Sequence, residues 1–274
     1  MKLLNIIMSI VIMFSITSCE DVIDNVDLDT AAPRLVIDAS IDWEKNTAGN
    51  EQKIKLTTTT GYYDSQFPTV SGATVTVINA VNTTFEFVEV QGSGEYVCNN
   101  FEPVIGQTYT LNINLNGETY TATETLIATP NIGDTIEQNN EGGMAGDEVE
   151  ITYYYQDDGT RTDYYLYGII DSHIAFPQYE VEDDDDIQGN LIPVYYSNED
   201  LVPGDVINIK LYGISKRCFD YFSKLLPASG NDTSPFPTVP NPVRGNIINQ
   251  TNGANYPYGY FRLSEVATKN YTIQ

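Results

Sequence analysis

The sequence predicts a mainly β protein, in which an N-terminal immunoglobulin-like β-sandwich is followed by a second β-rich domain with one amphipathic helix. Three observations lead to this prediction. Short runs that alternate apolar and polar residues recur along most of the chain. Clusters of Gly, Pro and Asn separate these runs, as turns separate strands. A helical spacing of apolar residues occurs after the leader at one place, near residues 215–226.

The composition excludes several classes of function. The chain has 274 residues, with 38 Asp and Glu against 13 Lys and Arg, a formal net charge of −25 and a single His. This acidic balance argues against nucleic acid or an anionic lipid surface as the main partner. One His and three Cys exclude a multi-histidine metal site and a four-cysteine zinc site. With 41% hydrophobic residues, the chain can still bury a sizeable core.

Residues 1–18 have the pattern of a signal peptide, with Lys2 followed by an apolar run over residues 3–14. This run is too short for a stable transmembrane helix. Small residues stand directly before Cys19, which resembles the lipobox of bacterial lipoproteins. Cleavage there would make Cys19 the first residue of the mature chain and attach a covalent lipid to it. The alternative is an ordinary cleaved signal, with Cys19 incidental.

Acidic residues follow this cysteine immediately. Glu20 and Asp21 resemble the surface-export signal of Bacteroidota lipoproteins, and residues 19–32 predict a flexible acidic tether with little to bury. A solvated tether of generic polarity is the alternative. We therefore expect the protein to be anchored in the outer membrane by its lipid and to face the cell surface.

Residues 33–128 are predicted to form the immunoglobulin-like sandwich. The clearest signal is an Asn116-Gly117 pair between two alternating runs, residues 109–115 and 118–122. Such a pair is the strongest short hairpin signal, because both central turn residues need a positive φ. About seven short strand candidates of this kind are what a sandwich of this class requires.

Residues 129–274 are predicted to form the second domain. Gly and Asn residues over 129–147 predict a break before it. Alternating runs then predict strands, and the segments that could close the second sheet are residues 258–263 and 271–273. Ser215 is a plausible N-cap for the helix over about 215–226. The apolar positions of that helix are Cys218, Tyr221, Phe222, Leu225 and Leu226.

The most acidic stretch, residues 180–186, holds six acids in seven positions. Such a run repels itself and usually stays solvated in a loop. Asp184, Asp186 and Gln188 copy the opening of an EF-hand calcium loop. Position twelve of that loop would be Tyr195, where a bidentate Glu is required, and the flanks do not predict two helices. We therefore expect a solvated loop, with a weaker calcium site at these residues as the alternative and no other cofactor.

No catalytic residues are predicted. Asp171, Ser172 and His173 are adjacent, and neighbours on one strand point to alternate faces, so they cannot form a proton relay. Cys98 and Cys218 lie far apart in the sequence, and two buried free thiols are favoured over a disulfide. These observations favour a protein that binds rather than catalyses.

Several motifs in a fixed order together resemble a Bacteroidota lipoprotein family known as domain of unknown function 4249. They occupy residues 19–21, 35–39, 63–73, 94–96, 106–111, 211–215 together with 241–247, and 259–261. The resemblance implies a surface lipoprotein that partners a SusC-type TonB-dependent outer-membrane receptor. It implies no catalytic residues.

The leading hypothesis is therefore a non-enzymatic accessory of a TonB-dependent nutrient transporter. Exposed aromatic loops suit recognition, so the candidate contacts with the barrel or its ligand are Tyr62, Tyr63, Phe67 and Phe236. One alternative is an adhesin or structural cell-surface module. A further alternative is a glycan-acting enzyme that uses paired carboxylates.

Overall fold

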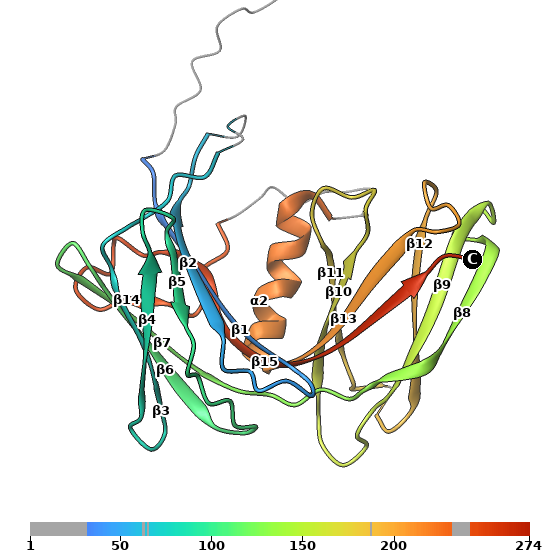
Figure 1. Cartoon of the computed structure of the whole chain (residues 1–274), viewed down its shortest axis with the longest axis horizontal. Helices are drawn as coiled ribbons and strands as arrows, with labels where there is room; N and C mark the ends of the chain where they lie inside the picture. The colour runs from blue at the N-terminus through green and yellow to red at the C-terminus, as the bar shows by residue number, and fades with distance from the viewer. Residues whose placement is uncertain (1–31, 62–63, 65, 187, 232–241) are drawn as a thin grey trace, which may run out of the picture. The chain divides into compact units, whose positions relative to one another are not determined.

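The described part of the chain is mainly β, as the sequence predicts (Figure 1). The structure is a computed structural model that describes residues 32–61, 64, 66–186, 188–231 and 242–274. A twelve-stranded sheet follows the order β11-β10-β13-β15-β1-β2-β5-β4-β3-β6-β7-β14, and a second sheet follows the order β12-β9-β8. Within these described residues, no helix combines the length and the apolar character needed to cross a membrane.

The N-terminal strands form a β-sandwich around one hydrophobic core, which confirms the predicted fold class. The strands of one layer are β1 (Leu35–Glu44), β2 (Gln52–Thr58) and β5 (Glu95–Cys98). The strands of the other layer are β3 (Thr74–Asn79), β6 (Thr108–Leu115), β7 (Glu118–Thr125) and β14 (Ile248–Asn249). Strand β4 (Thr84–Val90) passes between the layers, because its first residues pair with β3 and its last three with β5. Alternate residues from both layers meet in the core, for example Ile54, Phe85 and Leu111.

The hairpin predicted at Asn116-Gly117 joins β6 and β7. Asn116 has a φ of 51° and Gly117 a φ of 80°, which are the positive angles that a two-residue turn of this type needs. Leu111 faces Ala122 across the hairpin, and both side chains are buried in the core. The period-2 pattern therefore sets the register as well as the strands.

The second half pairs the two sheets around a core rich in tyrosine. One side is formed by β8 (Ile132–Gly142), β9 (Glu148–Gln156) and β12 (Leu191–Asn198). The other side is formed by β11 (Gln178–Asp183), β10 (Tyr164–Ile170), β13 (Val206–Ile214) and β15 (Tyr258–Thr272). Tyr153, Tyr155 and Tyr165 are almost fully buried between them. Burying these large side chains supplies much of the stability of this half.

The predicted helix is α2, Lys216–Leu226. Ser215 caps it, because its side chain accepts a hydrogen bond of 3.2 Å from the backbone N–H of Cys218. The apolar face of α2 packs on Leu166, Tyr212 and Val266, on the side of the sheet away from the tyrosine core. Figure 1 shows the helix in orange beside β10 and β13. A short π-helix, Pro227–Asn231, follows it.

Two sequence predictions about strands are wrong. Residues 129–147 are predicted as a break, yet β8 occupies most of them, with register shifts where its polar residues interrupt the ladder with β9. Residues 258–263 and 271–273 are predicted as two strands, yet the single strand β15, which ends at Thr272, contains the first segment and all but the last residue of the second. The polar residues between these segments stay in the sheet because they pair with β13, for example Thr268 with Lys210 and Lys269 with Ile209.

Strand β15 takes part in both halves of the fold. Its first part pairs in parallel with β1, from Val36 opposite Tyr258 to Glu44 opposite Val266. Its last part pairs antiparallel with β13. Phe261 and Leu263 enter the sandwich core, whereas Ala267 enters the tyrosine core. The domain boundary predicted at residue 128 stays a prediction.

Candidate functional site

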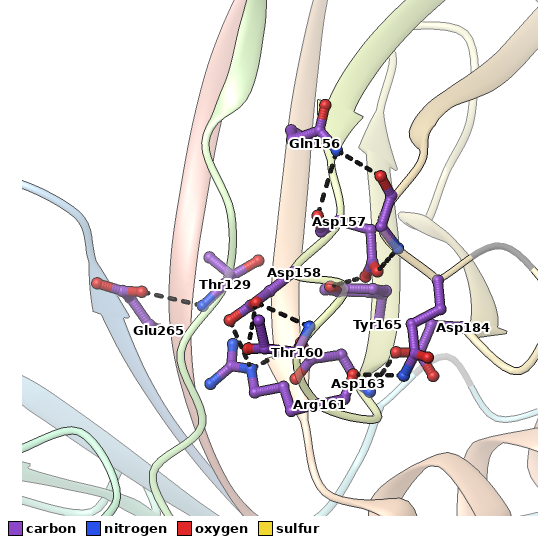
Figure 2. Close-up of polar contacts among 12 residues, drawn as sticks. Thr129, Gln156, Asp157, Asp158, Thr160, Arg161, Asp163, Tyr165, Asp184 and Glu265 are labelled. Atoms are coloured by element: carbon purple, nitrogen blue, oxygen red, sulfur yellow. Dashed lines mark hydrogen bonds and ion pairs between the residues drawn. The ribbon is translucent and has the colours of Figure 1, made fainter.

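Three buried aspartates converge at one end of the second half (Figure 2). Asp157 follows the end of β9, Asp163 precedes β10, and Asp184 follows β11. Their exposed fractions are 4%, 4% and 0%, and one carboxylate oxygen from each lies within 4.8 Å of the others. Aspartates are almost never buried unless they are paired or bind an ion, so this cluster is the candidate functional site.

The ladder between β10 and β11 brings two of these residues together. Its last pair is Tyr164 opposite Asp183, so Asp163 and Asp184 are the next residues on each strand. The backbone N–H of Asp163 donates to Oδ2 of Asp184 at 2.8 Å, and the N–H of Asp184 donates to the carbonyl of Asp163 at 3.3 Å. These two bonds fix the position of the Asp184 carboxylate.

The Asp157 carboxylate is held on both of its oxygens. The hydroxyl of the buried Tyr165 donates to Oδ1 at 2.6 Å, and the backbone N–H of Gly189 donates to Oδ2 at 2.7 Å. Burial and the hydrogen bond to Asp157 raise the pKa of Tyr165, which therefore keeps its proton and remains a donor. Both neighbours thus orient the carboxylate, as outer-shell groups orient metal ligands.

Arg161 is the basic residue of the cluster. Its Nε lies 2.8 Å from Oδ2 of Asp163 and 3.4 Å from Oδ2 of the exposed Asp158. The pKa of Asp163 is nevertheless raised, because burial outweighs the ion pair and the carboxylates of Asp157 and Asp184 add to the effect. One guanidinium therefore does not compensate three buried carboxylates.

Oδ1 of Asp184 is buried and has no hydrogen-bond partner among the described residues. A buried acceptor without a partner costs about 1–3 kcal/mol, and more when it is charged. Three carboxylates in this arrangement offer hard oxygen ligands of the kind that bind a divalent cation. Because they are buried, they cannot contact a polysaccharide, so this cluster is not the carboxylate pair that a glycan-acting enzyme requires.

The structure brings Asp184 together with Asp157 and Asp163, and not with the other two residues of the predicted calcium loop. Asp186 is exposed, and the exposed Gln188 donates through Nε2 to the carbonyl of Arg161 at 2.9 Å. Sequence reasoning missed Asp157 and Asp163. The one sequence signal at these two positions is an aspartate directly beside a predicted strand. Aspartates are also common in ordinary turns, so this signal does not mark a site.

The acidic run over residues 180–186 is not the fully solvated loop that the sequence predicts. Its first residues lie in β11, where Val181 pairs with Leu166, and Asp184 is fully buried. Glu180, at the start of the run, and Asp185 and Asp186, at its end, are exposed. Strand pairing thus holds the first part of the run in the sheet despite its charge, and the buried Asp184 adds a desolvation cost.

Of the predicted contact residues, the structure places Phe67, which is 62% exposed. Two hydrogen bonds to the Tyr96 hydroxyl fix the end of the loop that carries Phe67. This hydroxyl accepts from the N–H of Ala73 at 3.0 Å and donates to the carbonyl of Val70 at 3.1 Å. The other predicted residues lie outside the described residues. They are Cys19, Glu20, Asp21, Tyr62, Tyr63 and Phe236.

His173 lies at the surface and pairs with Asp205, with 2.8 Å between Nε2 and Oδ2. Cys98 and Cys218 are both buried free thiols in different hydrophobic clusters. Burial raises the pKa of the Cys98 thiol, and it also raises the pKa of the Cys218 thiol, there to about 12. Neither thiol is therefore a reactive thiolate at neutral pH.

The pair between His173 and Asp205 gives a testable pH effect. The hydrogen bond to Asp205 raises the pKa of His173 above its ordinary value of 6.5. The pair therefore stabilises the fold fully below about pH 6.5, and this contribution is lost as the pH rises through the higher folded-state pKa. Asp205→Asn is expected to lower the His173 pKa measured by NMR titration. Asp200→Asn, which removes a more distant charge, should lower it less; equal shifts would contradict the pairing.

Residues 23–270 match the family described as "Domain of unknown function (DUF4249)", so the chain belongs to this family. The resemblance seen in the sequence motifs is thereby confirmed. Among curated proteins, none matches this chain.

Two solved structures show weak similarity. A segment of two fibronectin type III domains from chicken tenascin covers 60% of this chain and 85% of its own, at 14% identity and a TM-score of 0.21. A DUF4785 family protein from Legionella pneumophila subsp. pneumophila str. Philadelphia 1 covers 65% of this chain and 52% of its own, at 8% identity and a TM-score of 0.26. We draw no conclusion from either, because both TM-scores are low.

Proposed function

We propose that this protein is a lipid-anchored accessory of a TonB-dependent outer-membrane transporter, faces the cell surface and binds rather than catalyses. The observation that carries the proposal is the apolar leader that ends at Cys19, followed directly by Glu20 and Asp21. Membership in the DUF4249 family over residues 23–270 is consistent with the proposal. The partner itself is what the resemblance of the sequence motifs implies, a SusC-type receptor.

The backbone contact between Arg34, just before β1, and Thr59 supports a contact role for the loop that carries Phe67. The N–H of Arg34 donates to Oγ1 of Thr59 at 2.9 Å, and the N–H of Thr59 donates to the carbonyl of Arg34 at 2.8 Å. The loop that begins at Thr59 therefore starts beside the point where the tether joins β1. A tether over residues 20–32 reaches at most about 45 Å when fully extended. The lipid on Cys19 would thus keep this loop within reach of a neighbouring barrel.

The anchor is tested by Cys19→Ser. This change removes the thiol that would carry the lipid, so palmitate labelling is expected to disappear and the protein to leave the outer-membrane fraction. Several acyl chains hold a protein at a membrane because each buried methylene contributes about 0.8 kcal/mol. Ser18→Ala keeps a small residue before the cysteine and should leave labelling unchanged. Full labelling of the Cys19→Ser variant would disprove the anchor.

The partner is tested by co-purification from outer membranes in mild detergent. Recovery of a TonB-dependent barrel with the intact protein is expected, and Phe67→Ala should lower it at least about fivefold if the loop carries an interface hot spot. Phe176→Ala is the control, since Phe176 is also exposed, at 76%, and follows β10 in the other half. Recovery of the protein alone would contradict the proposal. Recovery with a host or matrix protein in place of a barrel would favour the adhesin.

A further inference from the structure

We propose that Asp157, Asp163 and Asp184 bind one calcium ion, and that this ion ties the β9–β10 loop to the β11–β12 loop. The proposal concerns a different ligand set from the one that the acidic run predicts. It rests on the charge, the geometry and the hydrogen bonding of the buried cluster (Figure 2).

The charge of the cluster calls for a cation. The three buried carboxylates carry a formal charge of −3, and the part-exposed Arg161 beside them carries +1, which leaves −2 for the cluster. Buried charges are normally paired or bound to a metal, because removing them from water is costly. A divalent ion would bring the sum to zero.

The free oxygen of Asp184 points independently to a ligand. The side chain is 0% exposed, Oδ2 is taken by the N–H of Asp163, and Oδ1 has no partner among the described residues. Asp157 and Asp163 lie beside it and are acceptors only when ionised, so they cannot satisfy it. A cation bound to this oxygen would satisfy it and attract both neighbours.

The chemistry of the cluster favours calcium over other ions. All its ligands are oxygens, and calcium takes six to eight oxygens, so water and backbone carbonyls would complete the shell. Zinc prefers nitrogen and sulfur, and the single His173 is paired with Asp205. Two oxygens bound to one Ca²⁺ lie at most about 4.6–5.2 Å apart. The oxygens here lie within 4.8 Å of one another, which is compatible with one Ca²⁺. Mg²⁺ demands near-ideal octahedral geometry and is usually bound by one or two carboxylates, so three converging carboxylates favour the larger ion.

The ion would lock two loops that already touch. The N–H of Asp157 donates to the carbonyl of Asn190 at 3.0 Å, and Nε2 of Gln156 donates to the carbonyl of Gly189 at 3.0 Å. The loops are packed so closely that a Cβ on Gly159 would lie 2.8 Å from Cα of Gly189. One ion bound across the two loops would therefore stiffen the sheet edge formed by β11. The exposed residues Asp185 and Asp186 follow this strand.

The test is calcium titration by calorimetry and thermal unfolding, with the full-length protein purified in detergent and freed of metal by chelation. We expect one Ca²⁺ per chain with a Kd of about 0.1–1 mM, as in extracellular modules. About 10 mM CaCl₂ should then raise Tm by about 3–10 °C over the chelated protein. Mg²⁺ should bind more weakly.

Asp184→Asn is the deciding variant and Asp186→Asn its matched control. Asp184→Asn keeps the shape and can still accept from the N–H of Asp163, so it should fold, but its calcium affinity should fall at least about tenfold. In chelator its Tm should equal or exceed that of the natural protein, since one buried charge is removed. Asp186→Asn should bind calcium within about twofold of the natural protein, because Asp186 is exposed outside the cluster.

Three results would overturn the proposal. One is the absence of binding heat at about 10 mM Ca²⁺, which lies above the usual extracellular range. Another is an equal loss of calcium affinity in Asp184→Asn and Asp186→Asn. That result would mean that the ion binds to the acidic run over residues 180–186 and not to the buried cluster. The third is tighter binding of Mg²⁺ than of Ca²⁺, which would overturn the choice of ion. If Asp184→Asn fails to fold, Asp157→Asn serves as the second variant, with the same tenfold loss expected.

Discussion

Asp42→Ala is expected to lower the free energy of unfolding by about 3 kcal/mol, because it leaves a buried guanidinium without its carboxylate. The Arg262 side chain is 7% exposed, and its Nη2 lies 2.9 Å from Oδ1 of Asp42. The guanidinium also lies 4.5 Å from the centre of the Tyr212 ring and donates to Ser264. The expected loss is at the lower end for buried pairs, since Asp42 is 36% exposed and water can partly replace it.

A double variant separates the effect of the unpaired Arg262 charge on stability from the effect of side-chain packing. Arg262→Met in the Asp42→Ala background removes the stranded charge, so much of the lost stability should return. Urea unfolding with a common m-value measures the three free energies. The control is Glu95→Ala, which breaks the exposed pair of Glu95 with Lys53 at 3.1 Å and should cost less than about 1 kcal/mol. Equal losses in Asp42→Ala and Glu95→Ala would show that burial of Arg262 does not matter.

Gly259→Ala is expected to destabilise the fold by about 3–5 kcal/mol, through strain at a backbone position that only glycine tolerates. Gly259 has a φ of 96°, which residues with a side chain rarely adopt. It lies opposite Ile37 in the parallel pairing of β1 and β15, and an added Cβ would collide with the Ile37 carbonyl. Gly245 packs on the other side of this backbone, since its own Cβ would collide with the Gly259 carbonyl.

The matched control for Gly259→Ala is Gly253→Ala. Gly253 has no heavy atom within 4 Å of an added Cβ and no positive φ, so the change should stay within about 0.5 kcal/mol. Both free energies come from urea unfolding of the full chain. Losses of similar size at the two glycines would argue against the close approach of β1 and β15.

Local patterns were enough to predict much of the fold. Alternation predicts β6 and β7, Asn116-Gly117 predicts their turn, and helical spacing with Ser215 predicts α2. Each of these features is determined by residues that lie close together in the sequence. The parallel pairing of β1 with β15 joins residues about 220 positions apart, and no local pattern carries such information.

The candidate site was only partly predictable for the same reason. Asp184 stands out in the sequence because it belongs to an acidic run, and that run attracts attention to Asp186 as well. Asp157 and Asp163 look like ordinary turn residues at strand ends. The ladder between β10 and β11 and the contact of two loops bring the three together, and neither can be read from spacing along the chain.

The position of β15 in chain order has a consequence for biosynthesis. Every other described strand precedes β15 in the sequence, so the ribosome synthesises β15 last among them. In the sheet, β15 lies between β1 and β13 and pairs with both. Until residues 258–272 emerge, the sandwich lacks Phe261 and Leu263, and the tyrosine core lacks Ala267. Contacts of such long sequence separation also form slowly. We therefore expect both hydrophobic cores to stay incomplete until residues 258–272 have been synthesised.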